Sequence, residues 1–163
     1  MDLTTLGVKL GYATATTNGT KPTAFKWLKR AKSIGAIDLT VDSIDVTAIE
    51  DLIKQYADGA ADTGGKVDLT FGVSNDVIKQ LETYLSAGAT AKTGNKEFWH
   101  VVWFPALEKS FYFIATPGTS IGMPEVGVGN AAEIKMTLVL NEYKGLDIAV
   151  EPTAGEQQAM RRR

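Results

Sequence analysis

The sequence contains no cysteine, and its single histidine is His100. The absence of cysteine excludes disulfides, thiolate zinc sites, iron–sulfur clusters and cysteine nucleophiles. With one histidine as well, the chain has few side chains for transition-metal binding or nucleophilic catalysis. We therefore predict no catalytic residues, no metal and no cofactor, and we favour a binding or structural role.

Long apolar runs and a strong net charge are also missing. No stretch approaches the roughly 18 consecutive apolar residues of a membrane-spanning helix, so we expect no membrane insertion. The first residues include an acid, Asp2, where a signal peptide has basic residues. The 17 basic and 19 acidic side chains give a net charge of -2, unlike the basic balance of a typical nucleic-acid-binding domain.

The composition indicates one globular domain over residues 1–163. A chain of this length suits a single domain of ordinary size. Hydrophobic residues make up 44% of the chain and charged residues 22%, which argues against disorder.

Apolar and polar residues alternate in several segments, as expected of strands with one buried face. These segments are residues 6–12, 37–42, 66–73, 134–141 and 146–151. Many strands beside a single helix predict a mainly β protein, a β-sandwich or barrel with one flanking α-helix.

One segment has the periodicity of a helix, predicted over residues 75–87. Ser74 or Asn75 is a suitable N-cap, and Asp76 lies in the first turn, where the helix dipole favours an acid. Gly88 is expected to end the helix. The apolar stripe consists of Val77, Ile78, Leu81 and Leu85.

Aromatic residues concentrate between residues 98 and 114, on both sides of Pro105. The first strand of this hairpin is apolar on both faces, so both faces need a cover. The covers are either the core and the flanking helix, or the core and another subunit, and the sequence leaves both possibilities open. We expect His100 to be a structural histidine. The residues predicted to lie in a core or an interface are Trp99, Trp103, Phe111 and Phe113.

Three segments rich in turn residues are predicted to be irregular, residues 13–25, 42–65 and 117–131. In the first, Asn18-Gly19-Thr20 indicates a turn. The second is long for a loop of a compact domain, and such loops are usually functional. It also contains more apolar side chains than a solvated loop needs, so an ordered partner surface would account for them. These side chains are Ile44, Val46, Ile49, Leu52, Ile53 and Tyr56.

Charge is segregated along the chain. Residues 21–32 contain five basic side chains and no acid, whereas residues 38–62 contain seven acids and one lysine. A solvated surface would account for either block. The opposite signs would also suit head-to-tail association of identical chains.

Motifs for catalysis or cofactor binding are weak. The segment Gly127–Ala132 resembles the start of a dinucleotide fingerprint but lacks the strand–turn–helix context. The acids of residues 42–51 have neither the spacing nor the glycine of a calcium loop. The composition does not exclude a hydrolase with paired carboxylates, but no motif places two acids across a cleft.

Three stretches of sequence carry a family resemblance. They are LTTLGVKLGYATATTNGTKPTAF (residues 3–25), AIDLTVDSIDVTAIED (36–51) and YADGAADTGGKVDLTF (56–71). In this order they resemble the major tail tube proteins of long-tailed (siphovirus-type) bacteriophages and prophages, over roughly residues 3–90.

The resemblance implies a β-sandwich or barrel shared with contractile-tail tubes and the type VI secretion tube. It implies that six copies form a ring, and that rings stack into a tube in the virion tail. The implied partners are other copies of the chain, the tape-measure protein, and tail terminator and distal tail proteins. Double-stranded DNA would pass through the channel, and assembly would take place in the cytoplasm of the bacterial host.

By the same resemblance, the segment 42–65 contacts a neighbouring subunit or ring. An N-terminal arm over residues 1–20 is a second candidate contact, and residues 152–163 are expected to form a flexible tail. The basic partner of the long segment would be Lys26, Lys29 and Arg30. The expected contact residues within it are Ile44, Asp45, Val46, Ile49, Glu50, Asp51, Leu52 and Tyr56.

A second class of function fits the same pattern of strands. A β-sandwich binding module, such as a capsid decoration or carbohydrate-binding domain, would present exposed aromatic side chains to its ligand. Such a module could be a stable monomer, so its size in solution distinguishes it from a self-assembling subunit.

Overall fold

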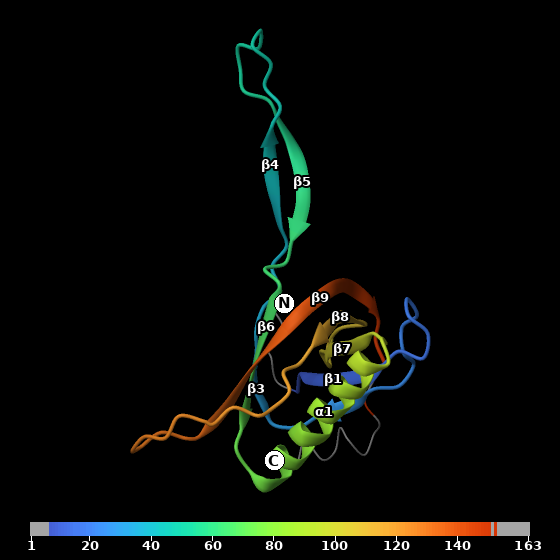
Figure 1. The fold of residues 1–163 in the computed structure, drawn as a ribbon, viewed down its shortest axis with the longest axis vertical. Coiled ribbons are helices and arrows are strands. Elements are labelled where there is room, and N and C mark those ends of the chain that lie inside the picture. Colours follow the sequence, from blue (N-terminus) through green and yellow to red (C-terminus); the bar gives the residue numbers. More distant parts are fainter. Residues whose placement is uncertain (1–6, 151, 153–163) are drawn as a thin grey trace.

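A computed structural model describes residues 7–150 and 152 of the chain. The fold is mainly β with one helix, and it confirms the predicted fold class (Figure 1). The elements are β1 (Lys9–Thr14), β2 (Lys26–Leu28), β3 (Ala31–Ile34), β4 (Thr40–Asp45), β5 (Tyr56–Asp62), β6 (Lys66–Gly72), α1 (Asn75–Thr93), β7 (Phe98–Trp103), β8 (Lys109–Thr116) and β9 (Glu133–Ile148).

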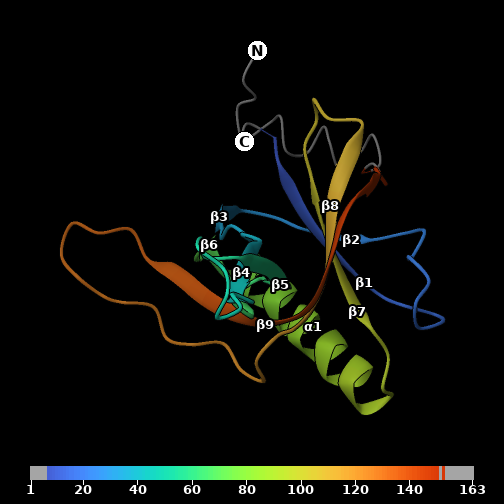
Figure 2. The same cartoon turned by 90° about the horizontal axis from the view of Figure 1, so that it is seen from above.

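Seven strands form one antiparallel sheet in the order β2-β1-β7-β8-β9-β6-β3. The edge strands β2 and β3 follow each other in the chain, and only Lys29 and Arg30 join them. Because so short a link holds the two edges together, the sheet must curl toward closure, as Figure 2 shows from above. Strands β4 and β5 form a separate two-stranded sheet.

Strand β9 joins the two halves of the curled sheet. It pairs with β6 over Glu133–Val139 and with β8 over Val139–Ile148. The prediction of two strands, 134–141 and 146–151, is wrong because the intervening residues also pair with β8. The pairing of β8 with β9 has register shifts at Tyr112/Phe113 and Ile114/Ala115. They accompany the interruption of the apolar–polar alternation in β9.

The helix begins as predicted and ends later. Ser74 is the N-cap, and its hydroxyl oxygen accepts a hydrogen bond from the Val77 backbone at 3.2 Å. The predicted end at Gly88 is wrong, since α1 continues to Thr93. Gly88 is buried against Pro117, where a Cβ atom would lie 2.5 Å from the ring Cγ. The glycine therefore permits a close contact between α1 and the segment after β8.

We expect Gly88→Ala to lower the free energy of unfolding by about 1–3 kcal/mol, the usual cost of overpacking a tight contact. The loss opposes the gain in helix propensity that alanine normally brings. Urea unfolding followed by circular dichroism measures it, with Ser86→Ala on the exposed side of α1 as the matched control. Unchanged stability of Gly88→Ala would show that the proline contact relaxes without cost.

The aromatic hairpin β7–β8 is covered on both faces by the chain itself. On one face, Phe98 and Phe113 belong to the core cluster that includes Leu81 and Tyr84 of α1. On the other face, Trp99 packs in a second buried cluster that includes Phe25 from the segment before β2. The helix therefore covers one face, as one of the two predictions had it. The cover of the other face comes from residues preceding β2, which the sequence did not indicate.

His100 is a buried structural histidine. Its Nε2 lies 2.6 Å from the Tyr84 hydroxyl oxygen, and its ring stacks on Phe113 with 4.9 Å between centroids. Burial lowers the pKa of His100 to about 3, so the ring is neutral in the folded protein near neutral pH.

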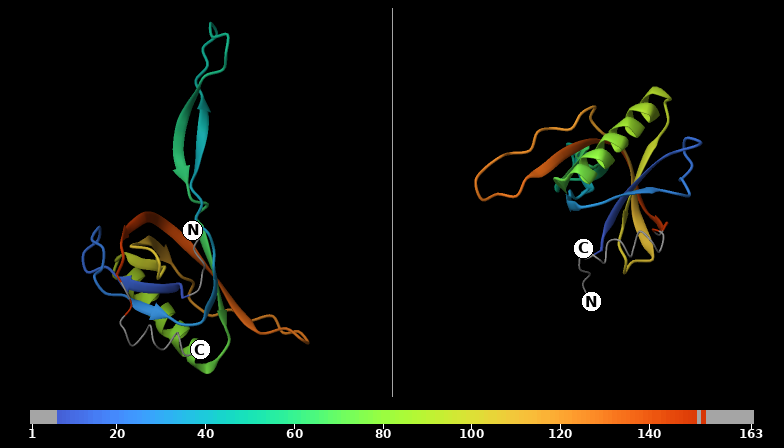
Figure 3. Two further views of the ribbon diagram at one scale, coloured as in Figure 1. Left: turned by 180° about the vertical axis from the view of Figure 1, so that it is seen from behind. Right: turned by 90° about the horizontal axis from the view of Figure 1, so that it is seen from below.

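The loops between the elements agree in part with the predictions from the sequence. The predicted turn at Asn18-Gly19 is confirmed by the hydrogen bond from the Thr20 N–H to the Thr17 carbonyl. Residues 117–131 are irregular, as predicted, and extend sideways from the body with the start of β9 (Figures 2 and 3). Within the predicted N-terminal arm, residues 9–14 are instead β1 of the main sheet. Residues 1–6, and residues 153–163 of the predicted tail, lie outside the described residues.

Candidate functional site

A long hairpin, residues 39–62, projects from the body of the molecule (Figures 1 and 3). It contains β4 and β5, so the prediction of an irregular segment over 42–65 is wrong in that respect. At about 3.4 Å per residue, β4 alone spans about 20 Å. The predicted buried face of segment 37–42 is also wrong, because every residue of β4 is exposed and only Ile37 packs against the core.

The pairing of β4 with β5 is antiparallel, with Ile44 opposite Ala57 and Asp45 opposite Tyr56. Directly opposed residues share a face, so Ile44 and Tyr56 lie on opposite faces of the hairpin. The register shifts between Val41 and Ser43. A Cβ atom on Gly59 would lie 2.8 Å from the Asp42 carbonyl oxygen, which accounts for glycine in β5.

The tip of the long hairpin, residues 46–55, is closed by its own hydrogen bonds. The Val46 N–H donates to the Gln55 carbonyl at 3.0 Å, and the Gln55 N–H donates to the Thr47 hydroxyl at 2.8 Å. The Ala48 N–H donates to the Asp51 carboxylate at 2.8 Å. The tip therefore has a defined conformation without a partner.

Two acids predicted as contact residues also stabilise the tip internally. Besides Asp51, the Asp45 carboxylate accepts the Thr47 backbone N–H at 2.9 Å. Hydrogen bonds from the hydroxyl and backbone of Thr47 hold the pKa of Asp45 below its usual value. A contact of these acids with another subunit stays a prediction.

The long hairpin exposes an unusual number of large apolar side chains, each more than half exposed. Ile49 and Leu52 at the tip are fully exposed. Soluble monomers rarely present so many neighbouring apolar side chains to water, so a partner surface is expected. The eight side chains are Leu39, Val41, Ile44, Val46, Ile49, Leu52, Ile53 and Tyr56.

The basic edge, Lys26, Lys29 and Arg30, lies on β2 and on its link to β3. The Gln80 side chain of α1 holds the backbone of Lys29, with its amide nitrogen 2.7 Å from the Lys29 carbonyl and its oxygen 3.0 Å from the Lys29 nitrogen. All three basic side chains are exposed, and within the described residues none forms an ion pair. A single chain does not bring the basic edge into contact with the acidic hairpin.

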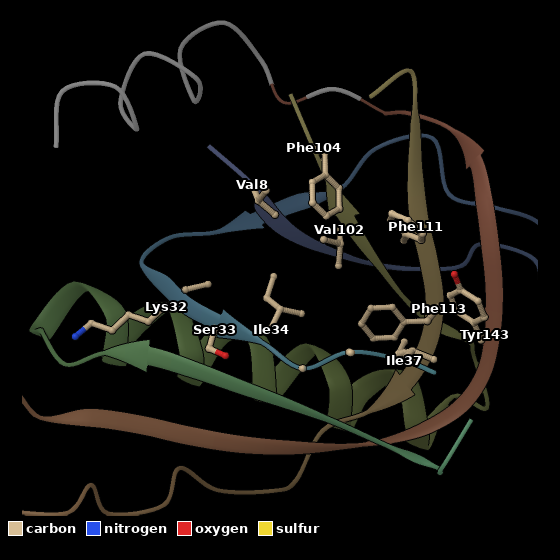
Figure 4. Close-up of a pocket in the computed structure, with 13 residues that line it drawn as sticks. Val8, Lys32, Ser33, Ile34, Ile37, Val102, Phe104, Phe111, Phe113 and Tyr143 are labelled. Atoms are coloured by element: carbon tan, nitrogen blue, oxygen red, sulfur yellow. The ribbon is translucent and has the colours of Figure 1, made fainter. Parts of the chain in front are cut away.

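A cavity of about 490 Å³, the apolar cleft, opens between β3 and the β7–β8 hairpin (Figure 4). Its one charged lining residue, Lys32, has its ammonium 3.4 Å from Glu133. Sequence reasoning missed this cleft because its lining comes from five separated segments. The lining residues are Val8, residues 31–37, Val102, Phe104, Phe111, Phe113 and Tyr143.

The predicted aromatic residues fall in two places. Trp99 and Trp103 are only 4% and 6% exposed, and Phe113 is buried. Phe111 is half-buried and lines the apolar cleft. Neither tryptophan is therefore part of the exposed aromatic surface that a carbohydrate-binding module would need.

The outer face of β6 and of the first half of β9 is polar. Thr137 donates a hydrogen bond to Asp68 at 2.8 Å across the two strands. Within the described residues, Glu133–Leu138 pairs with β6 on one side only, and β3 pairs only with β6. This half of the sheet, β3-β6-β9, thus has an unpaired edge at either side, which is a template for another strand.

Two findings concern chemistry and membranes. Over residues 7–150, the structure contains no group of three or more His, Asp or Glu side chains placed to hold a metal ion. In the same part of the chain, no helix is both long enough and apolar enough to cross a membrane.

Solved structures share this fold. A chain in the tail of an empty gene transfer agent particle with C6 symmetry matches with a TM-score of 0.53 and 10% identity, covering 91% of this chain and 99% of its own. A chain of an extracellular contractile injection system, the PVC sheath–tube complex, matches with a TM-score of 0.50 and 13% identity, over 86% of this chain and 89% of its own. A chain of the phage p2 baseplate matches with a TM-score of 0.52 and 13% identity, covering 83% of this chain and 45% of its own. No protein-family model and no curated protein matches the sequence.

These similarities confirm the predicted type of fold, that of phage tail tube proteins. They do not single out the long-tailed (siphovirus) type.

Proposed function

We propose that this protein is a structural subunit of a phage tail tube, without catalytic activity, that assembles into stacked hexameric rings. The observation that carries the proposal is the ordered long hairpin, with eight exposed apolar side chains on a chain of tail-tube fold. Such a surface is stabilised when another copy covers it.

Ring closure would use the two unpaired edges of the β3-β6-β9 half-sheet. Pairing β3 of one copy with β9 of the next is a heterologous contact, which closes into a ring when the rotation allows it. It would also remove edges that otherwise invite uncontrolled pairing.

The polar outer face of the same half-sheet is our candidate for the channel wall. It carries both signs of charge, with Lys66 and Lys135 near Asp68 and Glu133. Passing DNA would be held only weakly by a surface of such mixed charge, because binding to phosphate depends on an excess of cations.

Ring stacking would use the long hairpin, with Ile49, Leu52 and Tyr56 in the contact and the basic edge as an electrostatic partner. The tape-measure protein would lie in the channel before the genome passes, and terminator and distal tail proteins would bind the ends of the tube. Assembly would take place in the host cytoplasm and the product would be part of the virion.

Negative-stain electron microscopy of the concentrated full chain tests this proposal, with rings or tubes as the expected result. Light scattering after gel filtration gives the size of the species in solution. Persistent monomers under all conditions, also in the presence of other tail components, would contradict the proposal and favour a monomeric binding module.

A further inference from the structure

We propose that the apolar cleft is the acceptor site for the tip of the long hairpin of a second copy of this chain. The inference rests on the proposed function, because both partners are copies in one assembly. It assigns to the hairpin a specific receptor in the neighbouring subunit.

The cleft is apolar and open. Figure 4 shows Ile34 from β3 directed toward the same space as Phe104 and Phe113 from the β7–β8 hairpin. The ammonium group of its one charged residue, Lys32, is engaged by Glu133. A cavity of about 490 Å³ has room for several aliphatic side chains, and filling it would remove apolar surface from water.

The hairpin of the same chain cannot fill this cleft. Ile37 lines the cleft and Leu39 begins the hairpin, so the base of the hairpin lies beside the cleft. From there the hairpin extends away from the body, as Figures 1 and 3 show from opposite sides. The tip must therefore find its partner on another molecule.

The tip is apolar, like the cleft, and its conformation is already formed. Ile49, Leu52 and Ile53 lie within five residues of a turn that is already closed by hydrogen bonds. Because this conformation exists before binding, little backbone entropy is lost on docking.

Charge around the two surfaces is complementary. Glu50 and Asp51 lie between the apolar residues of the tip, and Arg30 directly precedes Ala31 at the border of the cleft. Attraction between these groups would orient the approaching tip and set its register, while the apolar side chains supply the affinity.

The segment 117–131 is a weaker candidate for the cleft. It also exposes apolar side chains, including Val126 and Val128, but it contains four glycines. Fixing glycine-rich backbone costs more conformational entropy than docking a preformed hairpin.

Cysteine cross-linking tests the assignment, since the chain has no native cysteine. Leu52→Cys at the tip is combined with Val102→Cys, a nearly isosteric change in a half-buried residue of β7 whose side chain lines the cleft (Figure 4). The matched control combines Leu52→Cys with Ser86→Cys on the exposed side of α1. A short bis-maleimide is added to assembled protein, and each single variant sets the background.

We expect the Leu52→Cys/Val102→Cys variant to form tubes and to convert mostly to covalent oligomers, and the control pair to stay at background. Tubes in which the cleft pair stays at background overturn the inference and leave the proposed function intact. Strong cross-linking of Val126→Cys with Val102→Cys also overturns it, because another segment then occupies the cleft. Failure of the unchanged chain to assemble removes the proposed function and the inference with it.

Discussion

The Ile49→Asp variant is expected to form no tubes, and to remain as monomers or single rings, at concentrations at which the unchanged protein forms tubes. Ile49 is fully exposed at the tip of the long hairpin, so the folded monomer loses no packing. In the assembly, the new carboxylate would have to leave water for an apolar surface. Loss of an interface anchor typically costs about 2–4 kcal/mol per contact, and the contact recurs in every subunit.

Electron microscopy and sedimentation of the purified variant measure this effect, and thermal unfolding checks the fold. Ile49→Val retains an apolar side chain and should still assemble. Thr83→Asp adds the same charge to the exposed side of α1, away from the hairpin, and should also assemble. Normal polymerisation of Ile49→Asp would refute the assignment of the tip to a subunit contact.

The sequence predicts those elements of the fold that bury a face within the chain. In β6, Val67, Leu69 and Phe71 are buried and alternate with less buried residues, so period-two alternation was a valid signal. The start of α1 was equally predictable, because capping by Ser74 is local chemistry. Where a position depends on a distant segment, as Gly88 depends on Pro117, local rules gave the wrong end of the helix.

The candidate site was predictable only where its residues are contiguous. Apolar side chains of the segment 42–65 indicated a surface for a partner, and they do lie together on one exposed hairpin. Residues 37–42 indicated a strand that overlaps the start of β4, but the rest of β4 and all of β5 were missed because apolar and polar residues do not alternate regularly there. The apolar cleft brings residues as distant as Val8 and Tyr143 together, and only the curvature of the sheet creates it.

A second large effect is expected from the burial of His100, which should make stability depend on pH below neutrality. The folded pKa is about 3, whereas an imidazole in the unfolded chain titrates near 6.5. Between these values the unfolded state binds a proton that the folded state does not. Stability is therefore complete above about pH 6.5 and falls as the pH is lowered, by up to about 1.4 kcal/mol per pH unit.

Urea unfolding at several pH values between 7.5 and 4.5 measures this slope. His100 is the single histidine of the sequence, and the lowered pKa values of Asp45 and Asp147 place their titration below this range. His100→Gln is expected to be less stable at pH 7.5 but to lose most of the slope. Tyr84→Phe removes the hydroxyl beside Nε2 while retaining the buried imidazole, so it should keep the slope. Equal slopes for His100→Gln and the unchanged protein would show that another group dominates the acid sensitivity.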